Sequence, residues 1–430
     1  ILREAFLSSL LPDVIHITSL FEGFSDQAVT SLGTLDQTTP VSLIIYDLIP
    51  YLNPKQYLSH NKHFEQHYHQ KIAYLKKASH LFAISAFAKE EAIQTLNLNS
   101  AQITNIFGAI DESLQHIRQE GLPDSSCLKA LGINRSFILH TGGGDERKNL
   151  PRLIQAFAKL PNVLRQKHQL VFVGRIPEVT LSQLKNEAAE AGLHQGELVF
   201  TKFITDAVLA RLYCDCSVYV FPSRHEGLGL PAMEAMAFEA PVIVANSSSL
   251  PEVVENKDAL FDPYDVDDIS NKISRVLEDP EFRDALVAHG KKRAQAFSWD
   301  ESAKRALRAW DGMRCPNQPN RDDWAAIQTA QQAIYKKTIN ALTGQFASDT
   351  SPELIRMVAF CLAHNEREAL STLRPRPLTM PIRWRLEGPF DSSYSLSIVN
   401  REVARALVRC GQEVSLHSTE GPGDFQPNPD

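Results

Sequence analysis

Apolar residues follow two different spacings over the first 125 residues, and the alternation between them predicts strands and helices in turn. Short apolar runs at 13–18, 41–47 and 80–85 have the length and content of buried strands, and helical spacing lies between them. Near-continuous apolar strands separated by helices are typical of a parallel sheet that is covered on both faces. Residues 1–125 are therefore predicted to form a doubly wound, Rossmann-like α/β lobe.

The same alternation restarts after a polar, proline-containing stretch near residue 123 and continues to residue 312. The predicted strands are 137–141, 169–173, 198–200, 217–221 and 242–245. Helical spacing lies between these runs and extends beyond the last of them. Residues 126–312 are therefore predicted to be a second doubly wound lobe with its own core.

Beyond residue 312 the pattern changes to helix without strand and then returns to strand. A Pro- and Asn-containing break at 315–321 indicates a linker, and helical patterns follow at 322–342 and 352–363. A strand at 382–386, a turn at Glu387–Pro389, a helix to Arg409 and a strand at 413–417 come last. The prediction is a helical spacer over 313–375 and a further α/β segment over 376–430.

Composition and charge exclude several classes of function. The 430 residues are 43% hydrophobic and 22% charged, which is typical of a globular chain. No apolar run approaches the roughly 18 to 20 residues that a membrane-spanning helix needs. The net charge of −7 argues against nucleic acid as a partner, and the six scattered cysteines lack a CxxC pair, which favours a reducing cytoplasm.

The sharpest motif is the sequence HEGLGLPAME at residues 225–234, directly after a predicted strand. Glu226 lies in a glycine-containing loop, and Pro231 is suited to be the first residue of the next helix, which places Glu234 in the first turn. Unpaired backbone N–H groups at such a helix start suit a phosphate, and carboxylates suit sugar hydroxyls. The plain alternative is that Glu234 only balances the helix dipole and Glu226 is a loop charge.

A second motif, HTGGGDERKN at residues 140–149, also follows a strand and opens a helix. It is not a dinucleotide fingerprint, because Arg147 stands where the third glycine would be, and it lacks the Gly-Lys-Ser/Thr of a phosphate loop. Arg147 and Lys148 beside a glycine turn suit a pyrophosphate. The alternative is a solvated, charged turn.

These two motifs, together with Pro251-Glu252-Val253, resemble the retaining GT-B-fold glycosyltransferases that carry a Glu-x7-Glu signature. The resemblance covers residues 1 to about 312 and is specific over 137–262. It implies a GT-B fold of two Rossmann-like lobes, in which 1–125 faces the acceptor and 126–312 binds a nucleotide sugar.

The resemblance also implies roles for individual residues. Glu234 would bind the ribose, Glu226 the donor sugar, and Arg147 with Lys148 the diphosphate. The remaining donor-binding positions that we expect are Gly143, Gly144, Lys202, Phe203, Gly227, Leu228, Gly229 and Leu230, where the Lys202–Phe203 loop would contact the base. His16 would face the active site from the first lobe.

Two departures from the family pattern stand out. Many members have an arginine where this chain has Gly143, and Arg147 is the available substitute. The glycine that usually follows the motif helix is Glu239 here, which predicts a left-handed backbone at a cost of about 1 kcal/mol.

The implied chemistry is transfer of a sugar with retention of configuration, without a protein nucleophile, a cofactor or a metal. The tandem bacterial polysaccharide enzymes that the chain resembles indicate GDP-mannose as donor and a saccharide or lipid-linked saccharide as acceptor. The expected location is the cytoplasm, either free or peripheral on the inner membrane. The histidines at 60, 63, 67 and 69 lack the HExxH spacing, so we expect no metal there.

The chain opens at Ile1 inside an amphipathic stretch, and its first methionine is Met233. We therefore expect a segment of a longer polypeptide with further domains, whose first lobe lacks its opening elements. Residues 376–430 resemble those opening elements. They are either the start of a second glycosyltransferase module or a strand and helix that complete the first lobe.

Two other functions remain open at this point. A sugar-nucleotide epimerase shares the two-lobed fold, and it would isomerise the donor without an acceptor. A non-catalytic module inside a larger synthase is the second alternative, against which the Glu226/Glu234 pair argues.

Overall fold

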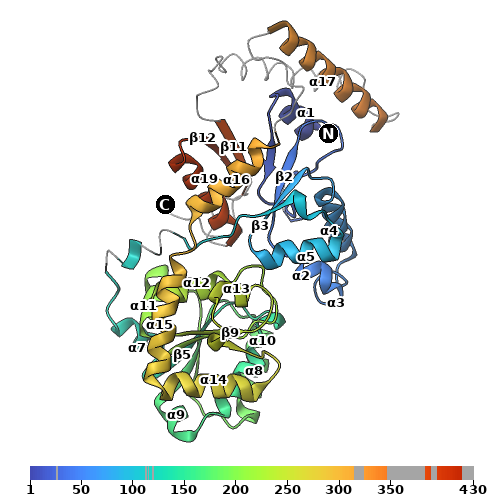
Figure 1. Ribbon diagram of the computed structural model, residues 1–430. Coiled ribbons are helices and arrows are strands. Elements are labelled where there is room, and N and C mark those ends of the chain that lie inside the picture. Colours follow the sequence, from blue (N-terminus) through green and yellow to red (C-terminus); the bar gives the residue numbers. More distant parts are fainter. Residues whose placement is uncertain are drawn as a thin grey trace. The chain divides into compact units, whose positions relative to one another are not determined.

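The computed structural model describes residues 1–25, 28–111, 114, 116–118, 121–313, 324–345, 383–388 and 395–418 (Figure 1). Contacts divide the chain into two compact units. The first comprises Ile1–Ala83, Glu91–Ile106 and Asp300–Asp430, and the second comprises Ile84–Glu90 and Phe107–Trp299. The domain boundaries at 125/126, 312/313 and 375/376 stay predictions.

The first unit contains a four-stranded parallel sheet in the order β1-β2-β3-β4. Its strands are β1 Ile15–Ile17, β2 Val41–Ile45, β3 His80–Ala83 and β4 Ile103–Asn105. Every residue of β2 is buried, as its continuous apolar sequence predicts for a central strand. The helices of this part are α1 Leu2–Ser9, α2 Ile49–Leu52, α3 Pro54–Tyr57, α4 Lys62–Leu75, α5 Ala86–Leu96, α16 Trp299–Asp311 and α17 Trp324–Gln345.

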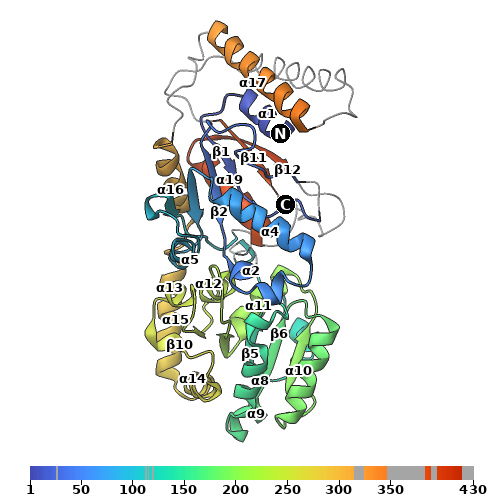
Figure 2. The ribbon, with the colours of Figure 1, turned by 90° about the vertical axis from the view of Figure 1, so that its right-hand side faces the viewer.

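The C-terminal segment packs within the first unit (Figure 2). Its elements are β11 Arg383–Gly388, α19 Ser395–Arg409 and β12 Glu413–Ser418, and β11 pairs in parallel with β12 as a separate two-stranded sheet. β11 lies against β1, and the Trp384 ring packs against Trp310 at 4.3 Å between centroids, with the ring planes tilted by 41°. The backbone ladders of the described residues do not join β11 to β1. Whether this segment completes the lobe or opens a second module stays a prediction.

The second unit contains a six-stranded parallel sheet in the order β10-β9-β8-β5-β6-β7. The strands are β5 Ser136–Thr141, β6 His168–Val173, β7 Leu198–Thr201, β8 Val218–Phe221, β9 Val242–Ala245 and β10 Leu260–Phe261. Helices lie on both faces of the sheet (Figures 1 and 2). They are α7 Ser126–Ala130, α8 Leu150–Ala158, α9 Asn162–Lys167, α10 Glu178–Glu190, α11 Asp206–Asp215, α12 Leu230–Ala237, α13 Leu250–Val254, α14 Val266–Glu278 and α15 Pro280–Ala294.

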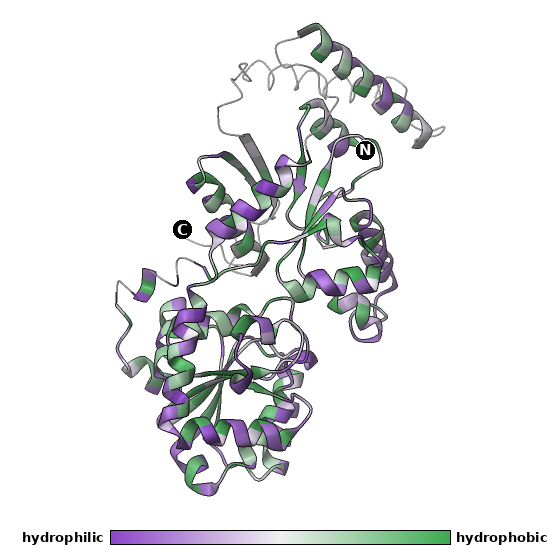
Figure 3. Cartoon of the chain, in the orientation of Figure 1, coloured by the Kyte–Doolittle hydropathy of each residue, from purple (hydrophilic) through white to green (hydrophobic). Residues whose placement is uncertain are grey.

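Hydrophobic patterning explains how this sheet is covered. All residues of β8 and β9 are buried, and the strands of this unit are coloured mostly as hydrophobic (Figure 3). α14 presents Ile269, Ile273 and Val276 to the core at helical spacing. Asp265 caps its start by accepting the backbone N–H groups of residues 267 and 268.

The structure differs from the sequence prediction in a few elements. β4 and β10 were not predicted, because strands of two or three residues leave no periodicity to detect. The expected turn at Glu387–Pro389 is wrong in its first two residues, since β11 runs through Gly388 and pairs there with Ser418. The left-handed backbone predicted for Glu239 is present, with φ +63°. The predicted helix at 352–363 lies outside the described residues.

Candidate donor-binding site

The two sequence motifs meet at the carboxyl ends of neighbouring strands. β5 and β8 are adjacent in the sheet, and chain order runs outward from them in opposite directions. This is the topological switch point, where open α/β sheets bind ligands. The glycine turn 142–149 follows β5, and the loop 222–229 follows β8.

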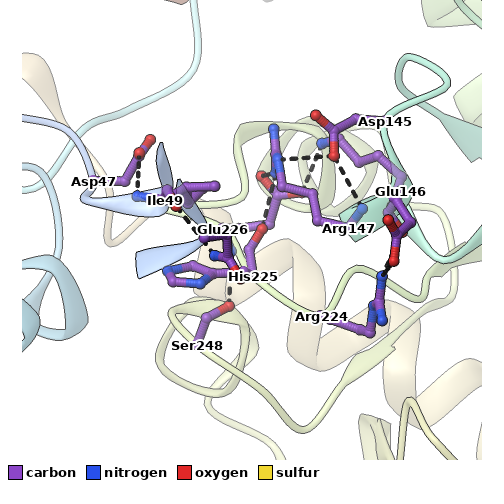
Figure 4. A network of polar contacts seen from close by, with 11 residues as sticks. Asp47, Ile49, Asp145, Glu146, Arg147, Arg224, His225, Glu226 and Ser248 are labelled. Carbon is purple, nitrogen blue, oxygen red and sulfur yellow. Dashed lines mark hydrogen bonds and ion pairs between the residues drawn. The ribbon is translucent and has the colours of Figure 1, made fainter. Parts of the chain in front are cut away.

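Glu226 forms an ion pair with both predicted diphosphate-binding cations, and Figure 4 shows the pair with Arg147. Its Oε1 lies 2.6 Å from Nζ of Lys148, and its Oε2 lies 2.7 Å from Nη1 of Arg147. Arg147 also donates to the His225 carbonyl oxygen at 2.8 Å. Two residues predicted for diphosphate and one predicted for sugar therefore share one cluster.

This cluster is largely shielded from water, which determines its charge state. Burial alone would raise the pKa of Glu226, but Lys148 and Arg147 outweigh it and hold the pKa below the usual value of 4.5. The imidazole of His140 lies nearby and is fully buried. Burial, aided by the positive charge of Lys148, lowers the pKa of His140 to about 4, so the imidazole is neutral and its Nδ1–H donates to the Val220 carbonyl oxygen.

Close backbone approach explains the glycines at this edge. A Cβ on Gly174 would clash with the Gly142 carbonyl oxygen, so the loop after β6 can lie against the turn after β5 only without a side chain. Gly229 adopts φ +99° as the N-cap of α12, and a Cβ there would lie 2.7 Å from Leu250 Cδ2.

Several backbone N–H groups point to no acceptor in the described parts of the chain. They are those of Gly143, Gly144, Gly227, Leu228 and Gly229. Unpaired amides at the start of a helix, beside an arginine and a lysine, form the kind of environment that binds a phosphate group.

Side chains that the sequence motifs did not identify brace the loop 222–229. The Ser248 hydroxyl oxygen accepts a hydrogen bond from the backbone N–H of Glu226 at 2.9 Å. The Ser249 hydroxyl donates to the carbonyl oxygens of Glu226 and Leu228. From the segment Ile84–Glu90, Ser85 donates to the Gly227 carbonyl oxygen at 2.6 Å. The run of three serines at 247–249, one residue after the end of β9, was the available sequence signal for two of these contacts.

Asn149 holds the end of the glycine turn in place and was also missed. Its backbone is left-handed at φ +60°, a conformation that asparagine tolerates better than most residues. Its Nδ2 donates to the carbonyl oxygens of Pro222 and Pro263, which ties the turn to the loops after β8 and β10.

Glu234 lies near the start of α12 and has a different environment from Glu226. The expected first-turn position is wrong by one residue, because the left-handed Gly229 lets α12 begin at Leu230 and makes Glu234 its fifth residue. The Tyr213 hydroxyl donates to its Oε2 at 2.8 Å. Burial, with repulsion from Asp206 and Asp111, raises the pKa of Glu234 to about 7 in spite of that hydrogen bond.

The other predicted site residues lie in varied surroundings. Lys202 and Phe203 follow β7 and are exposed, with Phe203 at 73% exposure. His16 lies on β1 of the first unit, where its Nδ1 is 2.9 Å from Ser42 Oγ and its ring packs edge-on against Phe82 and Trp310. Burial lowers the pKa of His16 to about 3. Its catalytic role stays a prediction.

The structure also bears on metals and membranes. Within the described ranges, no cluster of three or more histidine, cysteine or acidic side chains is arranged to hold a metal ion. In the same ranges, no helix combines the length and apolar character that crossing a bilayer requires.

A comparison with known protein families matches the segment that contains this site. The family model described as "Glycosyl transferases group 1" matches residues 129–293, which contain both motifs. Residues 129–293 form a group 1 glycosyl transferase domain.

Two relatives of this chain are named as mannosyltransferases. "Serotype-specific mannosyltransferase WbdA" of Escherichia coli is 33% identical over 79% of this chain and 42% of its own length. "O-antigen chain mannosyltransferase B" of Escherichia coli is 30% identical over 57% of this chain and 66% of its own length. The chain spans about two fifths of the length of the first of these relatives.

Solved structures establish the fold. A sucrose-phosphate synthase from Thermosynechococcus elongatus is 25% identical, with a TM-score of 0.51 over 64% of this chain and 67% of its own. HepE of Anabaena, solved in complex with UDP and glucose, is 18% identical, with a TM-score of 0.55 over 73% of this chain and 80% of its own. With its two parallel-stranded α/β lobes, the chain has the GT-B fold.

Proposed function

We propose that this chain transfers a sugar, with retention of configuration, from a nucleotide-sugar donor to a saccharide or lipid-linked saccharide of a bacterial surface polysaccharide. The names of the Escherichia coli relatives favour mannose as the sugar, and GDP-mannose is the donor to test first. The glycosyl transferase domain supplies the donor site.

One observation carries the proposal: Arg147 and Lys148 converge at the switch point, beside the unpaired amides of both loops. In the described residues Glu226 pairs with both cations, and Asp145 lies 3.8 Å from Arg147 Nε. A diphosphate has the charge and the acceptor oxygens to take the place of the Glu226 carboxylate or to share the cations with it. Glu234, near the start of α12, is the acceptor for ribose hydroxyls.

The proposed mechanism uses these groups to stabilise the leaving group. As the bond between the sugar and the diphosphate breaks, negative charge develops on the phosphate oxygens, and the two cations and the loop amides are already oriented toward it. The acceptor hydroxyl attacks from the face that the diphosphate leaves. Glu226 would position the donor sugar, and no protein nucleophile is assigned.

The proposal also covers the need for a metal ion and the place in the cell where the enzyme works. Since Arg147 and Lys148 can neutralise a diphosphate, the proposed reaction uses neither a metal nor a cofactor. The enzyme works in the cytoplasm, and a lipid-linked acceptor would bring it to the inner membrane peripherally. Domains beyond this chain are further proposed partners, since the chain spans two fifths of WbdA.

The test begins with binding. Calorimetric titration with GDP, UDP and ADP identifies the base, and the same assay with the matching mannose and glucose donors identifies the sugar. Incubation with the preferred donor and a mannose oligosaccharide should release free nucleoside diphosphate and yield a glycoside, whose anomeric configuration NMR determines. An inverted product refutes retention.

Two outcomes would replace the proposal. Conversion of the sugar nucleotide into an isomer without any acceptor would establish an epimerase. Binding of neither a nucleoside diphosphate nor a sugar nucleotide by the folded protein would leave a non-catalytic module.

A further inference from the structure

A chain of hydroxyl groups leads from the glycine turn to Glu234. The hydroxyl of Tyr213 on α11 donates to Oε2 of Glu234 and lies 3.3 Å from Oγ1 of Thr141. The hydroxyl of Tyr219 on β8 lies 2.9 Å from the same Oγ1. Thr141 is the last residue of β5, directly before the turn that carries Arg147. Four elements of the second unit therefore contribute to one polar chain.

Because the hydroxyl groups are buried, the donor and the acceptor of each hydrogen bond between them can be assigned. The side chains of Tyr213 and Tyr219 are fully buried, and the Tyr213 ring stacks on Phe238 with centroids 5.9 Å apart. Buried hydroxyls have to find partners among themselves. When Glu234 is ionised it only accepts, so Tyr213 donates to it, Thr141 donates to Tyr213, and Tyr219 donates to Thr141. Every proton then points toward the carboxylate, and each bond polarises the next.

The charges around Glu234 do not otherwise favour its ionised form. Asp206 from the start of α11 and Asp111 from the segment after β4 both repel a negative charge there. Tyr219 faces the Glu234 carboxylate from β8. Three other elements pack on α12, namely α13, α15 and β9. Among the described residues, none of these three places a titratable group beside Glu234. The Tyr213 hydrogen bond is the interaction in the described chain that favours the charged carboxylate.

Glu234 also keeps capacity to bind a ligand. Its Oε1 has no hydrogen-bond partner among the described residues, and Oε2 is used once. A carboxylate has about four lone-pair sites, so two adjacent hydroxyls can still donate to it.

We propose that Tyr213 is the positioning residue for Glu234: its hydroxyl keeps the carboxylate ionised and oriented to accept the two ribose hydroxyls, and Thr141 and Tyr219 fix Tyr213 in turn. The proposal rests on the proposed function, because it takes the nucleotide ribose as the ligand of Glu234. It assigns to two tyrosines and a threonine a role that the motif does not contain.

The test compares two matched variants, Tyr213→Phe and Tyr219→Phe. Each removes one hydroxyl from a fully buried tyrosine, but only the first removes a bond to Glu234. Affinity for GDP and UDP is measured by calorimetry from pH 6 to pH 9. Titration of the nucleotide phosphate is common to all variants, so differences between their pH profiles report on the protein.

For the wild type, affinity should rise as Glu234 ionises and then level off. Tyr213→Phe should move the midpoint of this rise to higher pH and weaken binding at pH 7 by about tenfold, as expected for loss of a hydrogen bond to a charged group. Tyr219→Phe should move the midpoint by much less, because Tyr219 reaches Glu234 only through Thr141 and Tyr213. In a Glu234→Gln background, Tyr213→Phe should cause no further pH-dependent change.

If the two phenylalanine variants lose nucleotide affinity equally and the midpoint of the pH dependence does not move, Tyr213 contributes only to core packing and the proposal is overturned. If Tyr213→Phe does not fold, Thr141→Val removes the donor to Tyr213 instead, and an unmoved midpoint in that variant overturns the proposal equally. A wild type that binds neither nucleotide at any pH overturns the proposed function and this inference together. A wild type that binds both, with an unshifted Tyr213→Phe, overturns this inference alone.

Discussion

Replacing Glu226 by glutamine should destabilise the ligand-free protein and tighten its binding of nucleoside diphosphate. Glu226 is 2.6 Å from Lys148 Nζ and 2.7 Å from Arg147 Nη1, and its side chain is 10% exposed. Glutamine keeps the shape but removes the carboxylate that contacts both cations, and it leaves Arg147 with Asp145 at 3.8 Å as a more distant partner. A bound diphosphate supplies negative charge to Arg147 and Lys148 again, so its binding free energy should be more favourable in the variant than in the wild type.

The expected magnitudes follow from this burial. Breaking a buried ion pair by removing one partner costs about 3 to 5 kcal/mol. Because Arg147 is a quarter exposed and keeps its bond to the His225 carbonyl, we expect the lower value, about 3 kcal/mol of unfolding free energy. If close to half of this is recovered when phosphates bind, the dissociation constant falls by about tenfold. Sugar transfer should decrease, since Glu226 is proposed to hold the donor sugar.

Urea unfolding with and without GDP, calorimetric titration and turnover measure the three effects. Glu197→Gln is the matched control, because Glu197 pairs with Arg165 at 3.1 Å, is similarly buried, and lies at the opposite, amino end of β7. The control should lose stability and keep its nucleotide affinity. Weaker nucleoside diphosphate binding in Glu226→Gln than in the wild type would refute the reasoning.

Four further predictions concern the remaining parts. Arg147→Ala with Lys148→Ala should weaken binding of a nucleoside diphosphate more than of the nucleoside, whereas equal losses in calorimetry would indicate a folding defect. Glu234→Ala should weaken nucleoside diphosphate binding by about 1.5 to 3 kcal/mol, and unchanged affinity would remove Glu234 from the site. In the wild type, the pKa of Glu234 is about 7 in the folded protein, against the usual value of 4.5. Because the folded protein holds this proton more tightly, the contribution of Glu234 to the free energy of unfolding falls as the pH rises from 4.5 to 7. Glu234→Gln should abolish that fall, as measured by urea unfolding at a series of pH values. Trp384→Ala should lower the stability of the first unit by about 3 kcal/mol, because Trp384 is 8% exposed and packs against Trp310. An unchanged unfolding curve by tryptophan fluorescence would show that the C-terminal segment contributes nothing there.

Much of the fold could be predicted because long parallel strands leave a continuous apolar run. The strand at Val242–Ala245 was predicted with its observed bounds, and β5 and β6 begin one residue before their predicted starts. Errors lie where the local signal is weak: the two-residue strand β10, and the start of α12, where the left-handed Gly229 begins the helix before Pro231. The periodicity of apolar residues does not encode these end effects.

The site residues on the two motifs could be named from sequence, but their contacts could not. Ser249 and Ser85 reach the loop after β8 from other elements, and such long-range bonds depend on how loops meet at the sheet edge. The Tyr213 hydroxyl is hidden for a similar reason, since a tyrosine on a predicted amphipathic helix is most simply interpreted as core. Only the fold brings it to Glu234.

The two carboxylates of the motif, Glu226 and Glu234, differ in their pKa values because their surroundings differ. Glu226 is held ionised by Arg147 and Lys148, while burial and two aspartates raise the pKa of Glu234 to about 7. Groups of one chemical type whose surroundings drive their pKa values apart usually have different tasks. In the proposed function Glu226 belongs to the charge balance of the diphosphate, which would be redistributed whenever a donor enters or leaves. Glu234 depends on a directed hydrogen bond instead, so its capacity to bind a sugar hydroxyl changes with pH while that of Glu226 does not.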